Sequence, residues 1–196
     1  PQRLRAHSAC SGRELAQTPL GASMVQRYGA AYVTIHRADL HQLLVHAVQG
    51  REGVFINHGQ PVEEILGLEG AATIRTPAYP CVEGDALLLA DGVWSQLRAG
   101  VLGDTSRPRV SGHLAYRALI PMADVPAAWR AHEVNVWLGP QLHAVHYPVR
   151  RGELLNVVVI VEGPAPEDLT QWDHAANALQ LARALQGSCA ALRDVV

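Results

Sequence analysis

Four apolar stretches follow one another between residues 110 and 162, and they constrain the fold more than any other feature of the chain. They are VSGHLAYRALIP, EVNVWLG, LHAVHYPV and ELLNVVVIVE. Their β-branched and aromatic residues, with polar residues between them, are typical of strands. The last three are separated only by turn residues, at Gly139-Pro140 and at the Arg-Arg-Gly sequence 150–152. Joins this short do not accommodate crossover helices, so the pattern predicts an antiparallel sheet of at least three strands.

Residues 20–103 show a different pattern, in which strand and helix signals alternate. The sequence AAYVTI predicts a strand at 30–35, and leucines at helical spacing predict a helix over 38–48. GVFIN, VEEILGL and AATIRT are three short strand candidates, and DALLLA at 85–90 is predicted to be a buried strand. The change of pattern near 104–110 indicates a domain boundary.

The two ends of the chain differ from each other. Residues 1–20 are polar and turn-rich, whereas residues 166–196 predict helix, with Pro166 as a starting residue and Gly187 as a break. The predicted helix carries Leu179, Ala182 and Leu185 on one face.

Composition narrows the classes of function. Hydrophobic residues make up 48% and charged residues 17% of the chain, which is enough apolar material for a sizeable core. The net charge of −2 and the lack of a basic block argue against a nucleic-acid groove. All sixteen lysine-plus-arginine positions are arginine, which excludes a Schiff-base lysine and a P-loop lysine within this sequence.

Cysteine usage and hydropathy indicate the compartment. The three cysteines lie far apart and form no CxxC pair, so neither a zinc site nor a disulfide framework is indicated, and we expect no metal. The longest apolar run is far shorter than the ~20 residues that a membrane helix needs. These features predict a cytoplasmic protein with reduced thiols.

The apolar run ALLLA ends at Asp91-Gly92, which Val-Trp-Ser and Arg98 follow closely. The carboxyl end of a strand in an open α/β sheet is where ligands bind. Glycine lets the backbone adopt positive φ or approach a ligand closely, and aspartate can accept hydrogen bonds from sugar hydroxyls or orient an arginine. An ordinary Asp-Gly turn has the same dipeptide, so the dipeptide alone does not separate a turn from a ligand site.

Its context resembles a known family. LADGVWSQLR resembles the DG motif of the single-component FAD-dependent aromatic hydroxylases, which include salicylate and 3-hydroxybenzoate hydroxylases. Three further stretches resemble this family in the same order: RYGAAYVTIHRADLHQLL (27–44), GHLAYRALIP (112–121) and VWLGPQLHAVHYPVRRGELLNVVV (136–159). Leu89 stands where the DG motif usually has glycine, and Ala31 where proline is often found. The family's GxGxxG motif and its later LLGDAAH-like run do not occur in this sequence.

The resemblance implies an α/β (α+β) fold made of two parts. Residues 1–109 would be part of a Rossmann-like FAD-binding domain that carries the HR and DG motifs. Residues 110–165 would form the antiparallel-sheet substrate domain, and residues 166–196 its helical segment. Because two FAD-binding motifs are missing, the resemblance also implies that the chain is a central fragment of a longer enzyme.

The resemblance assigns FAD contacts to four residues: Arg37, Val62, Asp91 and Gly92. Arg37 matches the arginine of the family's HR segment, and a guanidinium offers planar donors to phosphate or flavin oxygens. The structural alternative for Arg37 is a surface ion pair with Asp39 or Glu63. Val62 matches a residue whose backbone meets the adenine, and the Asp-Gly pair matches the motif on the FAD pyrophosphate side, which also serves the pyridine nucleotide.

Alternation along LHAVHYPV separates two faces of one strand. His143, Val145 and Tyr147 share one face, and Ala144 and His146 share the other. The resemblance implies that His143 is the catalytic base or hydrogen-bond partner of the substrate phenolate, and that Tyr147 positions the substrate. The alternatives are a histidine on a solvent face, or His146 in this role if the register is shifted by one. Opposite faces do not favour joint metal ligation by the two histidines.

By the same resemblance, the intact protein is a flavoprotein monooxygenase. It would hydroxylate a phenolic or aromatic carboxylate substrate with FAD as cofactor, NADH or NADPH as co-substrate, and O₂. The isolated fragment is expected to be inactive, with a small aromatic molecule rather than nucleic acid or membrane as the intact enzyme's partner. Two alternatives stay open: an FAD-fold oxidoreductase of another type, such as a reductase or halogenase, and a degenerate binding module that has lost FAD.

Overall fold

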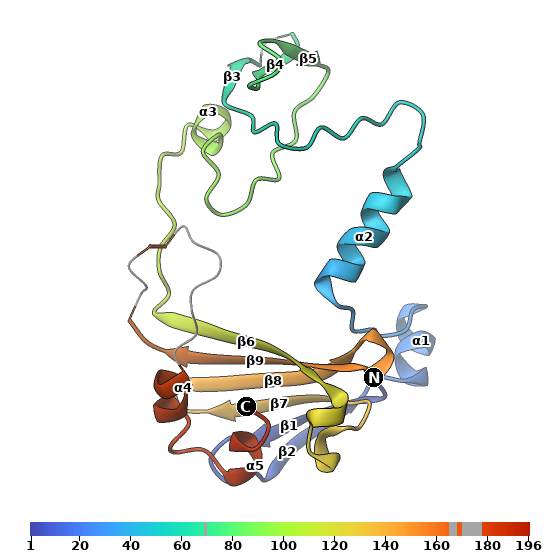
Figure 1. The fold of residues 1–196 in the computed structure, drawn as a ribbon, viewed down its shortest axis with the longest axis vertical. Coiled ribbons are helices and arrows are strands. Elements are labelled where there is room, and N and C mark those ends of the chain that lie inside the picture. Colours follow the sequence, from blue (N-terminus) through green and yellow to red (C-terminus); the bar gives the residue numbers. More distant parts are fainter. Residues whose placement is uncertain (69, 165–167, 170–177) are drawn as a thin grey trace. The chain divides into compact units, whose positions relative to one another are not determined.

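A six-stranded sheet organises the larger of the two units into which the chain divides (Figure 1). In the computed structural model, which describes residues 1–68, 70–164, 168–169 and 178–196, this unit holds Pro1–Leu44 and Ser111–Val196, and the other unit holds Val45–Val110. The strand order is β2-β1-β7-β8-β9-β6. The strands are β1 (Arg3–Ser8), β2 (Glu14–Pro19), β6 (His113–Pro121), β7 (Val134–Gly139), β8 (Leu142–Val149) and β9 (Leu154–Glu162).

Four of these strands form the antiparallel sheet predicted for residues 110–162. Strand β6 pairs with β9, β9 with β8, and β8 with β7, each time antiparallel. A tight turn joins β7 to β8, and a 3₁₀ turn, Arg150–Gly152, joins β8 to β9. The prediction of at least three antiparallel strands is confirmed.

Two N-terminal strands extend this sheet, although their sequence is polar and turn-rich. Strand β1 runs parallel to β7 and antiparallel to β2. Every residue of β2 is exposed, so this edge strand lacks the apolar alternation that marks a strand in sequence. Ion pairs support both strands, because Arg5 pairs with Glu14 of β2 and Arg3 pairs with Glu133, the residue before β7.

These strands change the expected division of the chain. Residues 1–109 were predicted as one domain, but residues 1–44 belong to the same unit as the sheet, because β1 pairs with β7. The smaller unit ends at Val110, beside the boundary predicted at 104–110.

The helices are α1 (Ala22–Tyr28), α2 (Arg37–Val48), α3 (Arg98–Leu102), α4 (Ala178–Ala184) and α5 (Ala190–Arg193). The helix predicted over 38–48 is confirmed by α2. The strand predicted at 30–35 is wrong: this segment links α1 to α2 without a strand partner, and Val33 is 73% exposed. None of the described helices has the length and apolar character needed to cross a membrane.

The C-terminal helices agree with the prediction only in part. The break at Gly187 is confirmed, since α4 ends before it and α5 begins after it. Of the three residues assigned to one helical face, Leu185 is buried, whereas Leu179 is 73% exposed and Ala182 is exposed. Leu181 and Leu185 pack against the core, because a spacing of four residues puts them on one side of α4. The predicted start at Pro166 and the helix predicted over 170–177 lie outside the described residues.

The smaller unit contains a three-stranded antiparallel sheet of β3 (Glu64–Gly67), β4 (Ala72–Arg75) and β5 (Val82–Gly84). The candidates VEEILGL and AATIRT correspond to β3 and β4. GVFIN and DALLLA form no strand, and Phe55 and Leu88 within them are each 87% exposed. A buried parallel strand needs hydrogen-bonded neighbours on both sides, and no described strand pairs with residues 85–90.

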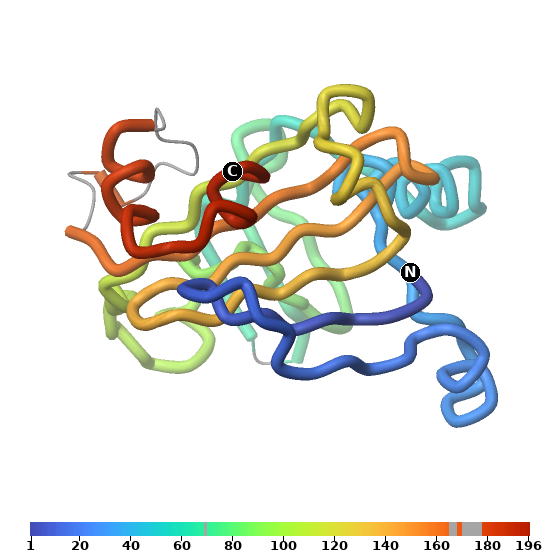
Figure 2. Tube along the Cα trace, turned by 90° about the horizontal axis from the view of Figure 1, so that it is seen from below, coloured from blue at the N-terminus to red at the C-terminus, as the bar shows by residue number. Residues whose placement is uncertain are grey.

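The hydrophobic core of the larger unit lies on one face of the six-stranded sheet. Trp137 of β7 and the alternate valines of β9 form its floor, and residues of the C-terminal segment cover them: Leu185, Leu192 and Val195. Figure 2 shows this segment crossing the sheet. Among the described residues, the buried core cluster therefore lies on this face of the sheet.

Candidate functional site

Strand β8 presents two chemically different faces. Leu142, Ala144 and His146 are buried, whereas His143 is exposed and Tyr147 is half-buried. The predicted division of this strand into two faces is confirmed. Each face can therefore be examined separately for its chemistry.

The exposed face of β8 continues onto β9. The antiparallel register places His143 opposite Ile160, and Tyr147 opposite Asn156. We call this surface the open face and define it by six residues of the two strands, none of which is fully buried: His143, Val145, Tyr147, Asn156, Val158 and Ile160. Aliphatic side chains form its middle, and polar groups lie at its ends. This is the composition of a site for a small, mostly apolar ligand with a few polar groups.

Arg117 of β6 borders the open face. It lies opposite Val158 in the β6–β9 register and therefore shares the same side of the sheet. An arginine at this place brings a positive charge beside an apolar floor. A planar carboxylate is the ligand group that a guanidinium binds best.

His143 and Tyr147 are separated along the strand. Four residues at a rise of about 3.3 Å each put their Cα atoms about 13 Å apart. This spacing suits contacts with opposite ends of a substituted aromatic ring better than shared contact with one hydroxyl.

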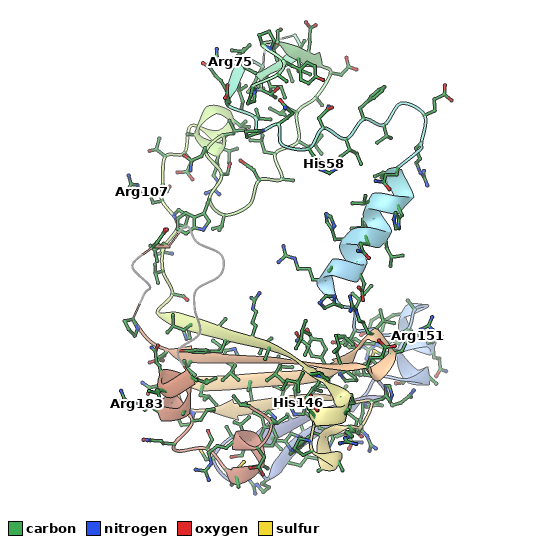
Figure 3. The ribbon with its side chains drawn as sticks, viewed as in Figure 1. His58, Arg75, Arg107, His146, Arg151 and Arg183 are labelled. Carbon is green, nitrogen blue, oxygen red and sulfur yellow. The ribbon has the colours of Figure 1, made fainter. Side chains whose placement is uncertain are left out.

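His146, the alternative candidate, lies in the core. His146 is labelled in Figure 3. It is 1% exposed, and Trp129 meets it edge to face with ring centroids 5.3 Å apart. Neither ring nitrogen has a hydrogen-bond partner among the described residues. Burial, followed by the nearby His7, lowers the pKa of His146 to about 4. A neutral imidazole enclosed in this way does not meet a ligand on the open face.

The Asp-Gly pair forms a turn stabilised by an arginine. Gly92 has φ of +82°, a conformation that favours glycine, and no atom would crowd an added Cβ there. Nη2 of Arg98 donates to the carbonyl oxygens of Gly92 and Val93 at 3.1 and 2.9 Å, and the Arg98 amide donates to Ser95 Oγ at 3.0 Å. The arginine therefore orients the turn through backbone carbonyls, and the Asp91 side chain stays exposed.

Arg37 is the first residue of α2 and is exposed. The two carboxylates considered as its structural partners contact other side chains. Asp39 accepts two hydrogen bonds from Arg150, and Glu63 lies 4.0 Å from Arg75.

The structure brings some predicted residues together and leaves others in separate units. His143 and Tyr147 share the open face, and Arg37 belongs to the same unit. Val62, two residues before β3, and the Asp91-Gly92 turn belong to the smaller unit.

Asn156 was missed in the sequence, although a signal for it existed. Pairing β8 with β9 through the Arg-Arg-Gly turn would have placed it opposite Tyr147. Among the described residues, no group of three histidine, cysteine, aspartate or glutamate side chains is placed to hold a metal ion.

Comparison with known proteins places these features in a family. No family model matches the chain. The chain is 34% identical over 191 residues to a 3-hydroxybenzoate 6-hydroxylase of Polaromonas naphthalenivorans, covering 97% of this chain and 46% of that protein. It is 35% identical over 162 residues to a 3-amino-4-hydroxybenzoate 2-monooxygenase of Streptomyces platensis, covering 83% and 38% respectively. The chain thus spans less than half the length of these relatives.

Solved structures share the fold. HpxO of Klebsiella pneumoniae, complexed with FAD and uric acid, superimposes with a TM-score of 0.77 at 24% identity, covering 100% of this chain and 48% of that one. A salicylate hydroxylase in complex with its substrate gives a TM-score of 0.76 at 20% identity, covering 97% and 48%. The sequence relatives and the structural neighbours together support a fragment of an FAD-dependent aromatic hydroxylase.

Proposed function

We propose that this chain supplies the substrate-binding sheet and part of the FAD-binding region of a monooxygenase that hydroxylates a phenolic or aromatic carboxylate substrate with NADH or NADPH and O₂. The observation that carries the proposal is the open face, where His143 and Tyr147 flank an aliphatic floor in a chain related to hydroxybenzoate hydroxylases. The relatives named above are hydroxylases or monooxygenases, which favours this reaction over a reductase or a halogenase.

The open face offers a distinct role to each of its polar groups. His143 would accept the proton of a ring hydroxyl, because the phenolate that results is a stronger nucleophile at its ring carbons. Tyr147, about 13 Å along the strand, would hydrogen-bond the opposite end of the substrate. Arg117 would attract the carboxylate of a hydroxybenzoate-like substrate. The aliphatic side chains between these groups would hold the ring and exclude water.

The residues assigned to FAD fit parts of that cofactor by their chemistry. The Arg37 guanidinium suits a phosphate or a flavin oxygen, and Gly92, which has no side chain, lets a ligand approach the backbone closely. Asp91 is an exposed acceptor for hydroxyl donors. When bound, FAD would pass electrons from NADH or NADPH to O₂, and one oxygen atom of that O₂ would enter the ring while the other leaves as water. The chain's own residues bind, orient and deprotonate the substrate.

The complete reading frame provides the test. We would express it with FAD supplied, record the flavin absorbance of the purified protein, and follow NADH and NADPH oxidation with a panel of hydroxybenzoates. Flavin binding together with substrate-stimulated oxidation and a hydroxylated product would support the proposal. A protein with no flavin and no stimulated oxidation would contradict it.

The 196-residue chain alone is expected to bind FAD too weakly to retain it through gel filtration. The reason is that a GxGxxG loop presents several backbone N–H groups and a helix N-terminus to the pyrophosphate, and this motif does not occur in the sequence. Flavin absorbance and protein absorbance across the eluted peak give the stoichiometry. One flavin retained per chain would show that the FAD contacts are misassigned.

A further inference from the structure

The turn between β8 and β9 contacts the segment that leads into α2, more than a hundred residues away in sequence. Nε and Nη2 of Arg150 donate to Oδ2 and Oδ1 of Asp39 at 2.9 and 2.7 Å, so the ion pair is bidentate. Nδ1 of His36 lies 3.5 Å from both Arg150 Nη2 and Asp39 Oδ1. In the segment just before α2, Thr34 Oγ1 donates to the carbonyl oxygen of Pro148 at 2.7 Å.

The turn that carries Arg150 has a backbone with little freedom to change. Arg150 and Arg151 have φ of +48° and +57°, and Gly152 has +92°. Residues other than glycine rarely adopt this region, so the surrounding structure holds the two arginines there. A Cβ at Gly152 would come within 2.8 Å of the His132 ring, so the turn lies closely against that side chain. The Arg150 side chain therefore extends from a backbone that its surroundings hold in place.

The electrostatics of the pair are consistent with a persistent contact. The hydrogen bond from Arg150 lowers the pKa of the Asp39 carboxyl, and the hydrogen bond to Asp39 raises the pKa of the Arg150 guanidinium. Both side chains therefore remain charged throughout the neutral range. The planar fork of arginine loses less side-chain freedom per hydrogen bond than an ammonium group would.

The position of the pair gives it a role beyond local stability. Strand β8, which carries His143 and Tyr147, ends at Val149, directly before Arg150. Helix α2 begins with Arg37, two residues before Asp39. The contacts of Arg150 and Pro148 thus connect the strand with the candidate substrate residues to the helix turn with the candidate FAD residue.

We propose that Arg150 is a positioning residue, whose bidentate ion pair with Asp39 holds the first turn of α2, and so the cofactor-side Arg37, at a fixed place relative to the substrate-side residues of β8. This inference rests on the proposed function, because the roles of Arg37 and His143 come from it. Small displacements of positioned groups have large effects, since an error of about 1 Å can cost about 10²-fold in rate.

The first arm of the test needs no cofactor. Amide hydrogen exchange is measured on the 196-residue chain for wild type, Arg150→Gln, and the matched control Arg151→Gln, which removes an equal charge from the neighbouring exposed residue. Arg150→Gln leaves the Asp39 charge at the helix N-terminus intact. Exchange at residues 38–42 is expected to become about two- to fivefold faster in Arg150→Gln and to stay unchanged in Arg151→Gln. Unchanged exchange in Arg150→Gln would overturn the inference.

The second arm uses the complete reading frame with FAD. Arg150→Gln is expected to raise the Kd for FAD about tenfold and to leave the KM for the aromatic substrate nearly unchanged. Arg150→Lys should recover part of the FAD affinity, because lysine keeps the positive charge but lacks the two parallel donors of a guanidinium. Faster exchange with an unchanged Kd would show a merely structural ion pair and overturn the positioning role. If the wild-type protein binds no FAD, the proposed function and the positioning role are both contradicted. The hydrogen-exchange result would still show whether the Arg150–Asp39 contact holds α2.

Discussion

Replacing His143 with alanine is expected to lower the rate of hydroxylation in the FAD-loaded enzyme by about 10²–10⁴-fold, the usual cost of losing a positioned acid–base group. FAD affinity should change little, since His143 lies on the open face with Ile160 opposite it and belongs to no group assigned to the cofactor. The side chain is exposed, so its removal leaves no cavity in the core and should cost little stability.

The measurement is hydroxylated product formed per NADH consumed. Without deprotonation of the substrate, reduced flavin is still oxidised by O₂, so NADH consumption should continue and release hydrogen peroxide. His143→Asn separates two roles, because an amide can donate a hydrogen bond but cannot take up the proton. Loss in both variants would identify a base, and recovery in His143→Asn would identify a hydrogen-bond donor.

His146→Ala is the comparison on the opposite face of the same strand. Because the His146 ring lies in the core, its removal should reduce the stability of the protein. The product yield per NADH should stay nearly unchanged in the molecules that remain folded. Should His146→Ala uncouple NADH oxidation while His143→Ala does not, the substrate would lie on the other face of the sheet. If neither variant uncouples, no histidine of β8 activates the substrate.

The arrangement of β8 could be predicted because its signal is local. A period of two assigns every side chain of a strand to one face, and the turn residues on both sides of LHAVHYPV limit the choice of partners. The same reasoning identified the division between His143 and His146. It did not extend to Asn156, because the neighbours of β8 on the sheet depend on the pairing of strands and not on the sequence of β8 itself.

The wrong strand predictions have a common physical cause. They depend on contacts between distant parts of the chain, which the local sequence pattern does not encode. DALLLA has the composition of a central parallel strand, yet such a strand exists only between hydrogen-bonded neighbours, and Leu88 is 87% exposed in the structure. Strand β2 is the reverse case. Its residues are all exposed, and it is held in the sheet by pairing with β1 and by the ion pair of Glu14 with Arg5. The contact of Arg150 with Asp39 is likewise invisible in sequence, since 111 residues separate the two side chains.

Lowering the pH from 7 to 4 is expected to reduce the free energy of unfolding of the chain by about 3 kcal/mol through His146 alone. In the unfolded chain this histidine has an ordinary pKa of about 6.5, whereas burial lowers the pKa to about 4 in the folded protein. The folded state therefore excludes the proton that the unfolded state binds. The stabilisation is complete above pH 6.5, is lost as the pH falls from 6.5 toward 4, and changes no further below 4.

Most of this effect falls in a range where carboxylates stay ionised. Between pH 7 and 5 the loss should already be about 2 kcal/mol, because the unfolded histidine is almost fully protonated at pH 5 while the folded one remains neutral. Urea unfolding at several pH values in this range measures it directly. Groups that do not interact with His146 contribute equally to wild type and to a variant, so the difference between the two reports His146 and its interaction with the nearby His7.

His146→Leu is the decisive variant, because it replaces an imidazole with no hydrogen-bond partner among the described residues by an apolar side chain of similar size. It should be about as stable as wild type at pH 7, since no buried hydrogen bond is lost, and more stable than wild type at pH 5 by about 2 kcal/mol. His143→Leu, on the exposed face of the same strand, should keep the wild-type pH dependence. A wild-type protein and a His146→Leu variant that lose stability in parallel between pH 7 and 5 would show that the ring opens to water or acquires a partner. In that case the two faces of β8 would differ less than their burial indicates, and the assignment of His143 as the accessible histidine would lose its main structural support.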